Sequence, residues 1–327
     1  MILVTGGVGY IGSHCVLALQ DAGFEVVVFD NLEGGHRRVI GDTPFIQGDL
    51  KNPHDVASVF EQYKIDVVIH FAAKIEVGES VINPQKYYYN NVYGTMNLLD
   101  AMWTYGCDRI IFSSTAAVYG EPKYTPIDEN HPKNPINPYG KSKFMVESIL
   151  DDYGGAYGLK SVRFRYFNVA GADKQNRTGE WHKPETHLIP NILKSTLLGG
   201  RVFEMYGNDY ETKDGTCIRD YINVEDLTQA HILGLKYLLS GGKTDCFNLG
   251  TKDGNSVKEI FGLCEKITGK EIPVKVHPRR IGDAAILVAD NQKAKDILGW
   301  LPTRTLRDSI ETAYEWERFL QGRMIDA

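Results

Sequence analysis

The chain has 327 residues, of which 43% are hydrophobic and 24% charged, and its formal net charge is −6. This length provides one large or two ordinary domains with complete cores. The mildly acidic composition contains no basic stripe, which argues against nucleic acid as a partner. No apolar run reaches the ~18 residues of a membrane span, and the chain opens in an apolar strand without signal-peptide features, so we expect no membrane association and a cytoplasmic location.

Cysteine and histidine spacing gives no sign of a metal. The five cysteines are odd in number and scattered, and none forms a Cys-x-x-Cys pair. Such a set is typical of reduced thiols in a cytosolic protein. The nine histidines show no cluster of ligand spacing either, so the sequence predicts no metal site.

The first residues have the strand–turn–helix pattern of a dinucleotide-binding protein. The apolar strand Ile2–Thr5 runs into the glycines of a G-x-G-x-x-G motif, and a helical pattern follows. Glycines at this spacing permit a tight turn and close approach of the backbone to a pyrophosphate, which the helix N-terminus then faces. A glycine-rich turn without a ligand is the less favoured interpretation. The motif consists of Gly7, Gly9 and Gly12, with Gly6 forming an overlapping G-x-x-G-x-x-G.

An acidic residue ends the second predicted strand, Val26–Asp30. A carboxylate at this place accepts hydrogen bonds from the adenosine ribose hydroxyls and repels a 2′-phosphate. The sequence therefore predicts NAD rather than NADP as cofactor.

Strands and helices alternate through the first half of the chain. This alternation predicts an α/β fold with a Rossmann-type, doubly wound parallel sheet that binds ligands at the carboxyl ends of its strands. After about Phe167 the elements become shorter and mixed. We expect an NAD-binding domain over residues 1–167 and a smaller mixed α/β substrate-binding domain over 168–327, with some later elements packing back on the first. The expected strands of the first half are Ile2–Thr5, Val26–Asp30, Pro44–Gln47, Val67–Phe71, Arg109–Ser113 and Ser161–Tyr166.

Tyr139 and Lys143 lie four residues apart in a predicted helix. Asn137 is a good N-cap and Pro138 suits the first helical position. Residues i and i+4 share a helix face, so the hydroxyl and the ammonium can meet at one small molecule, and the ammonium favours the phenolate. From this spacing alone, a surface tyrosine and lysine are the commoner interpretation. The glycine-rich start of the chain shifts the balance toward a base that works beside a nicotinamide.

A series of longer motifs resembles the extended short-chain dehydrogenase/reductases and, within them, the UDP-galactose 4-epimerases. The matches occur in order along nearly the whole chain. They are Val4–His14, Asp30–Leu32, Gly48–Leu50, His70–Ala73, Val77–Val81, Phe112–Gly120, Asn137–Lys143, Arg165–Gly171, Gly207–Ile222 and Arg280–Asp283.

The resemblance implies NAD-dependent interconversion of UDP-glucose and UDP-galactose through transient oxidation at sugar C4. Its catalytic positions are Thr115, Tyr139 and Lys143. Tyr139 takes the 4-hydroxyl proton, Thr115 hydrogen-bonds the same oxygen, and Lys143 binds the nicotinamide ribose and keeps the tyrosine acidic.

The resemblance also implies two sets of binding residues. The cofactor set consists of Gly6, Gly9, Tyr10, Ile11, Gly12, Asp30, Asn31, Asp49, Leu50, Phe71, Ala72, Ala73, Asn90 and Phe167, together with Tyr139 and Lys143. The UDP-hexose set consists of Asn168, His187, Leu188, Tyr206, Arg219, Arg280 and Asp283, together with Thr115 and Tyr139. Two arginines suit a diphosphate and a carboxylate suits ribose hydroxyls. Tyr206 either stacks on uracil or packs in the core.

Several positions leave alternatives open. Lys74 stands one residue before a cofactor-contacting lysine of some members, and His187 replaces an asparagine found in others. Leu287 lies where tolerance of a 2-N-acetyl group is thought to be set, so a UDP-N-acetylglucosamine 4-epimerase or dual specificity stays open.

Other functions fit the residues less well. Nucleotide-sugar dehydratases need an acid and a base where this chain has Ala116 and Ala117. A non-catalytic NAD-binding protein would be free to lose Tyr139 or Lys143. The family often dimerises through two helices, here Asn90–Met102 and Pro138–Ile149, so we expect a homodimer.

Overall fold

Seven short runs rich in β-branched and aromatic residues form one parallel sheet in the computed structural model, which describes residues 1–197, 201–280 and 283–325. The strand order is β3-β2-β1-β4-β5-β6-β10, so the order reverses direction between β1 and β4. In such sheets ligands bind in the crevice at the reversal point, outside the carboxyl ends of the strands. The strands are β1 (Ile2–Thr5), β2 (Val26–Asp30), β3 (Phe45–Gln47), β4 (Val67–His70), β5 (Arg109–Thr115), β6 (Lys160–Tyr166) and β10 (Asp245–Leu249).

Helices cover both faces of this sheet. One core cluster joins helix residues such as Leu19 and Leu235 to strand residues such as Val28, and a second joins Leu98 and Val146 to the opposite face. The doubly wound fold class predicted from the sequence is therefore confirmed. On the first face lie α1 (Tyr10–Asp21), α8 (Val224–Leu239) and α10 (Gln292–Leu298), and on the second α2 (Pro53–Gln62), α5 (Gly94–Thr104) and α6 (Pro138–Tyr157).

Helix α6 begins where its sequence predicts. The Asn137 side chain accepts a hydrogen bond from the Gly140 N–H at 2.8 Å, and Pro138 occupies the first turn. The helix ends at Gly158, whose φ of 77° is the left-handed conformation that favours glycine. These two ends place Tyr139 in the first turn of the helix, beside the carboxyl end of β5.

The helical segment that precedes β5 consists of three consecutive parts. The α-helix α4 (Pro84–Tyr87) continues into a π-helical turn, η2 (Tyr88–Tyr93), before α5 begins. A π-helical turn holds an extra residue and occurs frequently at functional sites. Here it contains Asn90, which is exposed to the cleft described below, and Asn91, which is buried and bonds to Lys74.

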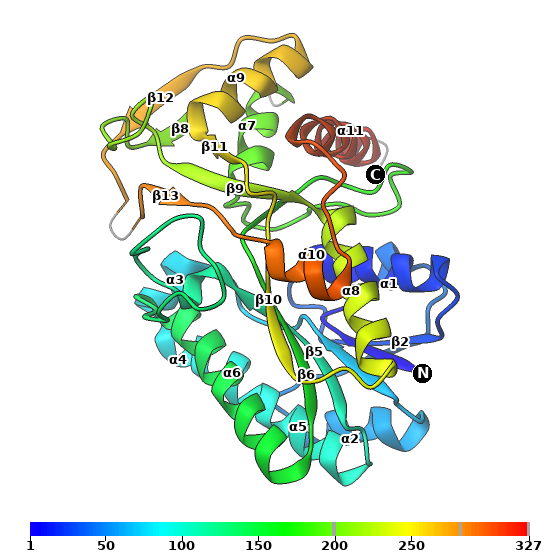
Figure 1. Ribbon diagram of the computed structural model, residues 1–327. Helices are drawn as coiled ribbons and strands as arrows, with labels where there is room; N and C mark the ends of the chain where they lie inside the picture. The colour runs from blue at the N-terminus through cyan, green and yellow to red at the C-terminus, as the bar shows by residue number, and fades with distance from the viewer. Residues whose placement is uncertain (198–200, 281–282, 326–327) are drawn as a thin grey trace.

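Smaller sheets and three helices form a second layer above the carboxyl ends of the large sheet (Figure 1). Strand β9 (Ile218–Asn223) pairs with β7 (Asn168–Ala170), β11 (Gly254–Ser256) and β13 (Ile286–Leu287), and β8 (Phe203–Tyr206) pairs with β12 (Val274–His277). Their core also includes α7 (Leu188–Leu197), α9 (Val257–Thr268) and α11 (Leu306–Ile325). Since β10 belongs to the large sheet although it follows residue 168, the two layers are not contiguous in sequence.

The remaining short helices are η1 (Arg37–Ile40), α3 (Val77–Ile82) and η3 (Ala116–Val118). Among the described residues, no helix has the length and apolar character to cross a membrane.

Candidate active site

A cleft of about 2110 Å³ separates the carboxyl edge of the large sheet from the second layer. Every residue of the predicted cofactor and substrate sets lines it, except Lys143. The cleft also receives the loop between β7 and α7, which sequence reasoning assigned only at His187 and Leu188. The structure thus brings the two predicted binding sets to one cavity.

The turn after β1 requires glycine at two places. At Gly6, which has a φ of +72°, an added Cβ would lie 2.5 Å from the Ala72 nitrogen, and at Gly12 it would lie 2.1 Å from the Gly6 carbonyl oxygen. Helix α1 starts at Gly9 without a side-chain cap and without an acid in its first turn. Its first N–H groups are therefore available to an anion at the positive end of the helix, which fits a pyrophosphate.

Asp30 ends β2 beside this turn. Its carboxylate accepts hydrogen bonds from the N–H groups of Leu32 at 2.8 Å and Val8 at 3.3 Å. Burial raises the pKa of Asp30, and these N–H groups lower it. Asn31 reaches across to the Asp49 carboxylate at 3.4 Å. These contacts hold an acidic rim where the sequence predicted the adenosine ribose.

Thr115 and Tyr139 meet at the carboxyl end of β5. Thr115 is the last residue of that strand, and its hydroxyl accepts the Ala117 N–H at 3.1 Å. Burial raises the pKa of Tyr139, a hydrogen bond with Thr115 lowers it, and the Glu76 carboxylate raises it again. The two hydroxyls thus form one polar spot in a largely apolar part of the cleft.

Lys143 lies behind the residues that line the cleft. Its buried ammonium donates to the Ser113 carbonyl at 2.7 Å and lies 4.9 Å from the centre of the Phe112 ring. Burial lowers the pKa of Lys143 to about 7, and Glu147 raises it. The roles that the resemblance implies for Lys143 stay predictions.

A buried asparagine that the sequence gave no reason to select fixes the loop after β4. The Asn91 amide donates to the Lys74 carbonyl and to the Ser142 hydroxyl, each at 3.0 Å, and its oxygen accepts the Lys74 N–H at 2.8 Å. The loop is thereby tied to α6. Asn90, which was predicted, lines the cleft and donates to Asn91. Lys74 itself pairs with Glu33 at 2.6 Å.

The second layer supplies the predicted nucleotide-sugar residues. Arg219 on β9 lies 3.5 Å from the Asp283 carboxylate, and the Arg280 guanidinium lies 4.1 Å from the centre of the Tyr206 ring. Two arginines and an aromatic ring on one wall suit a nucleoside diphosphate. Asn168, on β7, lines the same cleft.

Leu287 lies on β13, opposite Arg219 in the pairing with β9. Its partly buried side chain packs in a cluster with Phe167 and Phe144. It does not line the cleft directly.

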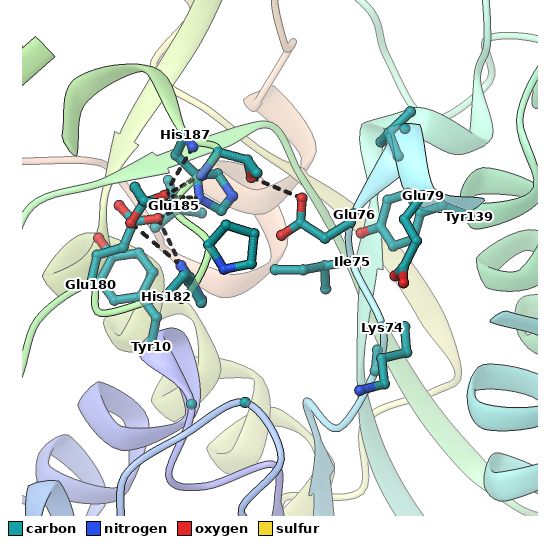
Figure 2. Close-up of a pocket in the computed structure, with 18 of the residues that line it drawn as sticks. Tyr10, Lys74, Ile75, Glu76, Glu79, Tyr139, Glu180, His182, Glu185 and His187 are labelled. Carbon is teal, nitrogen blue, oxygen red and sulfur yellow. Dashed lines mark hydrogen bonds and ion pairs between the residues drawn. The ribbon is translucent and has the colours of Figure 1, made fainter. Parts of the chain in front are cut away.

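The expectation that the histidines form no cluster of ligand-type residues is wrong. Glu180, His182, Glu185 and His187 gather at one point of the β7–α7 loop, with one potential ligand atom from each lying within 4.8 Å of the others. Figure 2 shows this group on the side of the cleft opposite Glu76 and Tyr139. The signal was present in the sequence as Glu-x-His-x-x-Glu-x-His.

Comparison with known proteins gives consistent matches. A family model described as GDP-mannose 4,6 dehydratase matches residues 3–313. The chain is 48% identical over 315 residues to a UDP-glucose 4-epimerase of Rhizobium leguminosarum bv. trifolii, with 96% of each chain covered. A crystal structure of a UDP-glucose 4-epimerase superposes with a TM-score of 0.95 at 49% identity, covering 98% of both chains. That of the Brucella ovis enzyme in complex with NAD gives 0.93 at 45% identity, covering 96% of this chain and 97% of the other.

Proposed function

The chain belongs to the extended short-chain dehydrogenase/reductases and, within them, to the family of UDP-glucose 4-epimerases, and we infer that it interconverts UDP-glucose and UDP-galactose with NAD as its cofactor. The observation that carries this function is the shared cleft. It joins a glycine turn shaped for a pyrophosphate, the Thr115 and Tyr139 hydroxyls, and a wall with two arginines.

The cofactor side of the cleft fits a dinucleotide. The space at Gly6 and Gly12, the uncapped start of α1 and the Asp30 carboxylate would hold the pyrophosphate and the adenosine ribose. NAD, when bound, supplies the acceptor and donor of hydride for sugar C4. Most of residues 1–167 thus form the cofactor side, and much of 168–327 the substrate side, although β10, α8 and α10 belong to the large sheet and its cover.

Proton transfer falls to Tyr139. Its phenol, as the phenolate, accepts the proton of the sugar 4-hydroxyl and later returns it, while the Thr115 hydroxyl hydrogen-bonds the same oxygen. Because burial raises the Tyr139 pKa, a positive charge in the cleft is needed to favour the phenolate. The oxidised nicotinamide of bound NAD would supply such a positive charge.

Lys143 would help to position the nicotinamide ribose. One of its three N–H donors is engaged by the Ser113 carbonyl, which leaves two donors for ribose hydroxyls. Burial at this point also keeps its flexible stem in one place.

The nucleotide-sugar would lie along the second wall. Arg219 and Arg280 would bind the diphosphate, Asp283 the uridine ribose and Tyr206 the uracil ring. The start of α7 at Leu188 lines the same cleft, with His187 directly before it and Asn168 nearby. With the diphosphate fixed, the sugar can turn over and present its other face to the hydride.

Two assays test the function. Purified protein with bound NAD, incubated with UDP-glucose, should accumulate some absorbance of reduced nicotinamide and should form UDP-galactose in a coupled assay. A non-catalytic NAD-binding protein would give neither signal.

A second candidate substrate is UDP-N-acetylglucosamine. Leu287 is intermediate in size, packs against the same buried cluster as Phe167 and is not among the residues that line the cleft, so its side chain gives no reason to exclude a 2-N-acetyl group. Coupled assays of both sugars with the same preparation decide between single and dual specificity.

We also propose a homodimer. Apolar side chains lie exposed along η2 and α5, at Tyr89, Met96 and Trp103, and along α6, at Met145 and Tyr157. Exposed apolar residues that form a continuous surface are typical of protein interfaces. Light scattering should give twice the chain mass, and Trp103→Glu should lower it to that of one chain.

A cytoplasmic location is supported by the five cysteines, all described and all unbridged.

A further inference from the structure

The loop between β7 and α7 carries a group of carboxylate and imidazole side chains, of which the proposed function uses only His187. Glu180, His182, Glu185 and His187 each direct one ligand-type atom to a common point, with all four atoms within 4.8 Å of one another (Figure 2). We propose that these residues bind one divalent transition-metal ion of the zinc class, which fixes this loop as a wall of the cleft. The proposal does not depend on the epimerase activity.

Two atoms of the cluster are buried without a hydrogen-bond partner. They are Nδ1 of His182 and Oε2 of Glu185, which lie 3.9 Å apart. Each has one longer ionic contact, Nδ1 with Glu180 at 3.4 Å and Oε2 with the Lys194 ammonium at 3.5 Å. The Glu185 side chain is only 4% exposed. A buried polar atom that makes no hydrogen bond is rare in native proteins and costs free energy. A cation between them would satisfy both atoms at once.

The other oxygen of Glu185 is held by backbone contacts. Oε1 accepts the N–H groups of Thr186 and His187, each at 2.9 Å. These bonds fix the orientation of the carboxylate, as outer-shell hydrogen bonds do around metal ligands. They leave Oε2 as the oxygen that is available to an ion.

His187 is shared between two carboxylates. Its Nδ1 lies 2.8 Å from Oε1 of Glu180 and 2.9 Å from Oε1 of Glu185. One N–H can donate well to only one acceptor, so an ion-pair network alone leaves this arrangement incompletely satisfied.

One positive side chain already lies beside the cluster. The Lys194 ammonium lies 3.5 Å from Oε2 of Glu185 and 3.4 Å from Glu317. A metal ion at the cluster would therefore replace Lys194 at Glu185, and Glu317 would retain the ammonium.

The donor set indicates which ion would bind. Two imidazole nitrogens and two carboxylate oxygens suit Zn²⁺ better than the oxygen-seeking Mg²⁺ or Ca²⁺. Ligand atoms around tetrahedral zinc lie about 3.4 Å apart, so the widest pairs of the cluster must approach by roughly 1 Å. The pairs that His187 makes at 2.8 and 2.9 Å must separate slightly. The segment has neither helix nor strand between Ala170 and Leu188, which permits this contraction.

The experiment uses full-length protein without a polyhistidine tag, stripped of metal by a chelator and then titrated with Co²⁺ and Zn²⁺. We expect one ion per chain, an intense visible Co²⁺ spectrum typical of tetrahedral coordination, and its loss when Zn²⁺ is added. The double variant His182→Asn/Glu185→Gln should bind at least tenfold more weakly. The control is His36→Asn, since His36 stacks on Trp181 of the same loop, with ring centres 3.5 Å apart, but lies outside the cluster.

The proposal is overturned if the double variant binds Co²⁺ as tightly as the unaltered chain, or if the spectrum is that of the hydrated ion. Crystals of the unaltered chain soaked in Zn²⁺ provide a test that needs no variant to fold. An anomalous peak among the four side chains supports the site, and a peak elsewhere or no peak refutes it.

Discussion

The two walls of the cleft are built in different ways. The wall with Thr115 and Tyr139 stands on a strand and a helix of the large sheet, whereas the wall with Glu180 and His187 is an irregular loop. Groups that exchange protons need fixed geometry, and regular elements give it. A loop can instead adapt to a ligand. We therefore propose that the first wall carries the chemistry and that the second wall provides adjustable binding.

Buried polar contacts explain why the first wall is rigid. Glu147, on α6, accepts the Arg165 Nε–H at 2.9 Å and the Ser114 hydroxyl at 2.5 Å. Glu147 and Arg165 are 2% and 3% exposed. These contacts lock α6 onto β5 and β6 within two turns of Tyr139. The second wall has its charged contacts within one loop and with α7 and α11.

Removal of the Tyr139 hydroxyl should have the largest effect. Tyr139→Phe takes away the proposed base, and general-base catalysis contributes ~10²- to 10⁴-fold to turnover. We expect kcat to fall by about this factor while NAD remains bound. Coupled turnover assays and cofactor extraction measure the two properties. Tyr157→Phe, at an exposed position of the same helix, is the control, and unchanged turnover in Tyr139→Phe would contradict the assignment.

The buried ion pair between Glu147 and Arg165, which supports the first wall, can be broken by a substitution outside the cleft. Glu147→Ala leaves the buried Arg165 charge unpaired, and such a loss costs about 3–5 kcal/mol of stability. Chemical denaturation should report this decrease in the free energy of unfolding. Asp152→Ala removes an exposed carboxylate of the same helix and should change stability by less than about 0.5 kcal/mol. Equal effects of the two variants would show that the wall does not depend on this pair.

Acid should weaken the sheet beneath the first wall. His231, on α8, packs against Phe71 and Phe164, and burial lowers its pKa to about 4, although a backbone bond to Leu227 raises it. The unfolded chain therefore takes up a proton near the ordinary histidine pKa before the folded chain does. Stability is complete above that value and is lost as the pH falls toward about 4.

His231→Leu should remove this part of the acid sensitivity. Between about pH 7 and pH 5, the unaltered chain should lose about 2 kcal/mol more than the variant. Denaturation curves at both pH values measure the difference. His54→Gln, at an exposed histidine, should follow the unaltered chain, and a variant as acid-sensitive as the unaltered chain would refute the role of His231.

The first wall was largely predictable from the sequence because local rules determine it. Asn137 and Pro138 mark the start of a helix, and the glycine spacing before α1 marks a pyrophosphate turn. Alternating apolar strands indicated the sheet. Each of these signals acts within a few residues, so a single sequence contains it.

Other features depend on contacts between distant segments. Asn91 acts through Lys74 and Ser142, and nothing in the local sequence distinguishes it from its neighbour Asn90. The direction of the Lys143 ammonium follows from burial against Phe112 and β5, which helical spacing does not reveal. The Glu and His positions of the second wall were spaced for a cluster, but only the folded loop shows that they converge.

The smallest predicted effect concerns a hydrogen bond that joins the two walls. The Thr186 hydroxyl, on the loop, donates to the Glu76 carboxylate across the cleft at 2.8 Å. Because the bond is exposed, it contributes about 0.5–1 kcal/mol, so Thr186→Val should raise KM for the nucleotide-sugar roughly two- to fivefold with little change in kcat. Thr186→Ser keeps the donor and should behave as the unaltered chain. If both variants shifted kcat instead, the loop would take part in the chemistry, and the division of labour between the walls would be wrong.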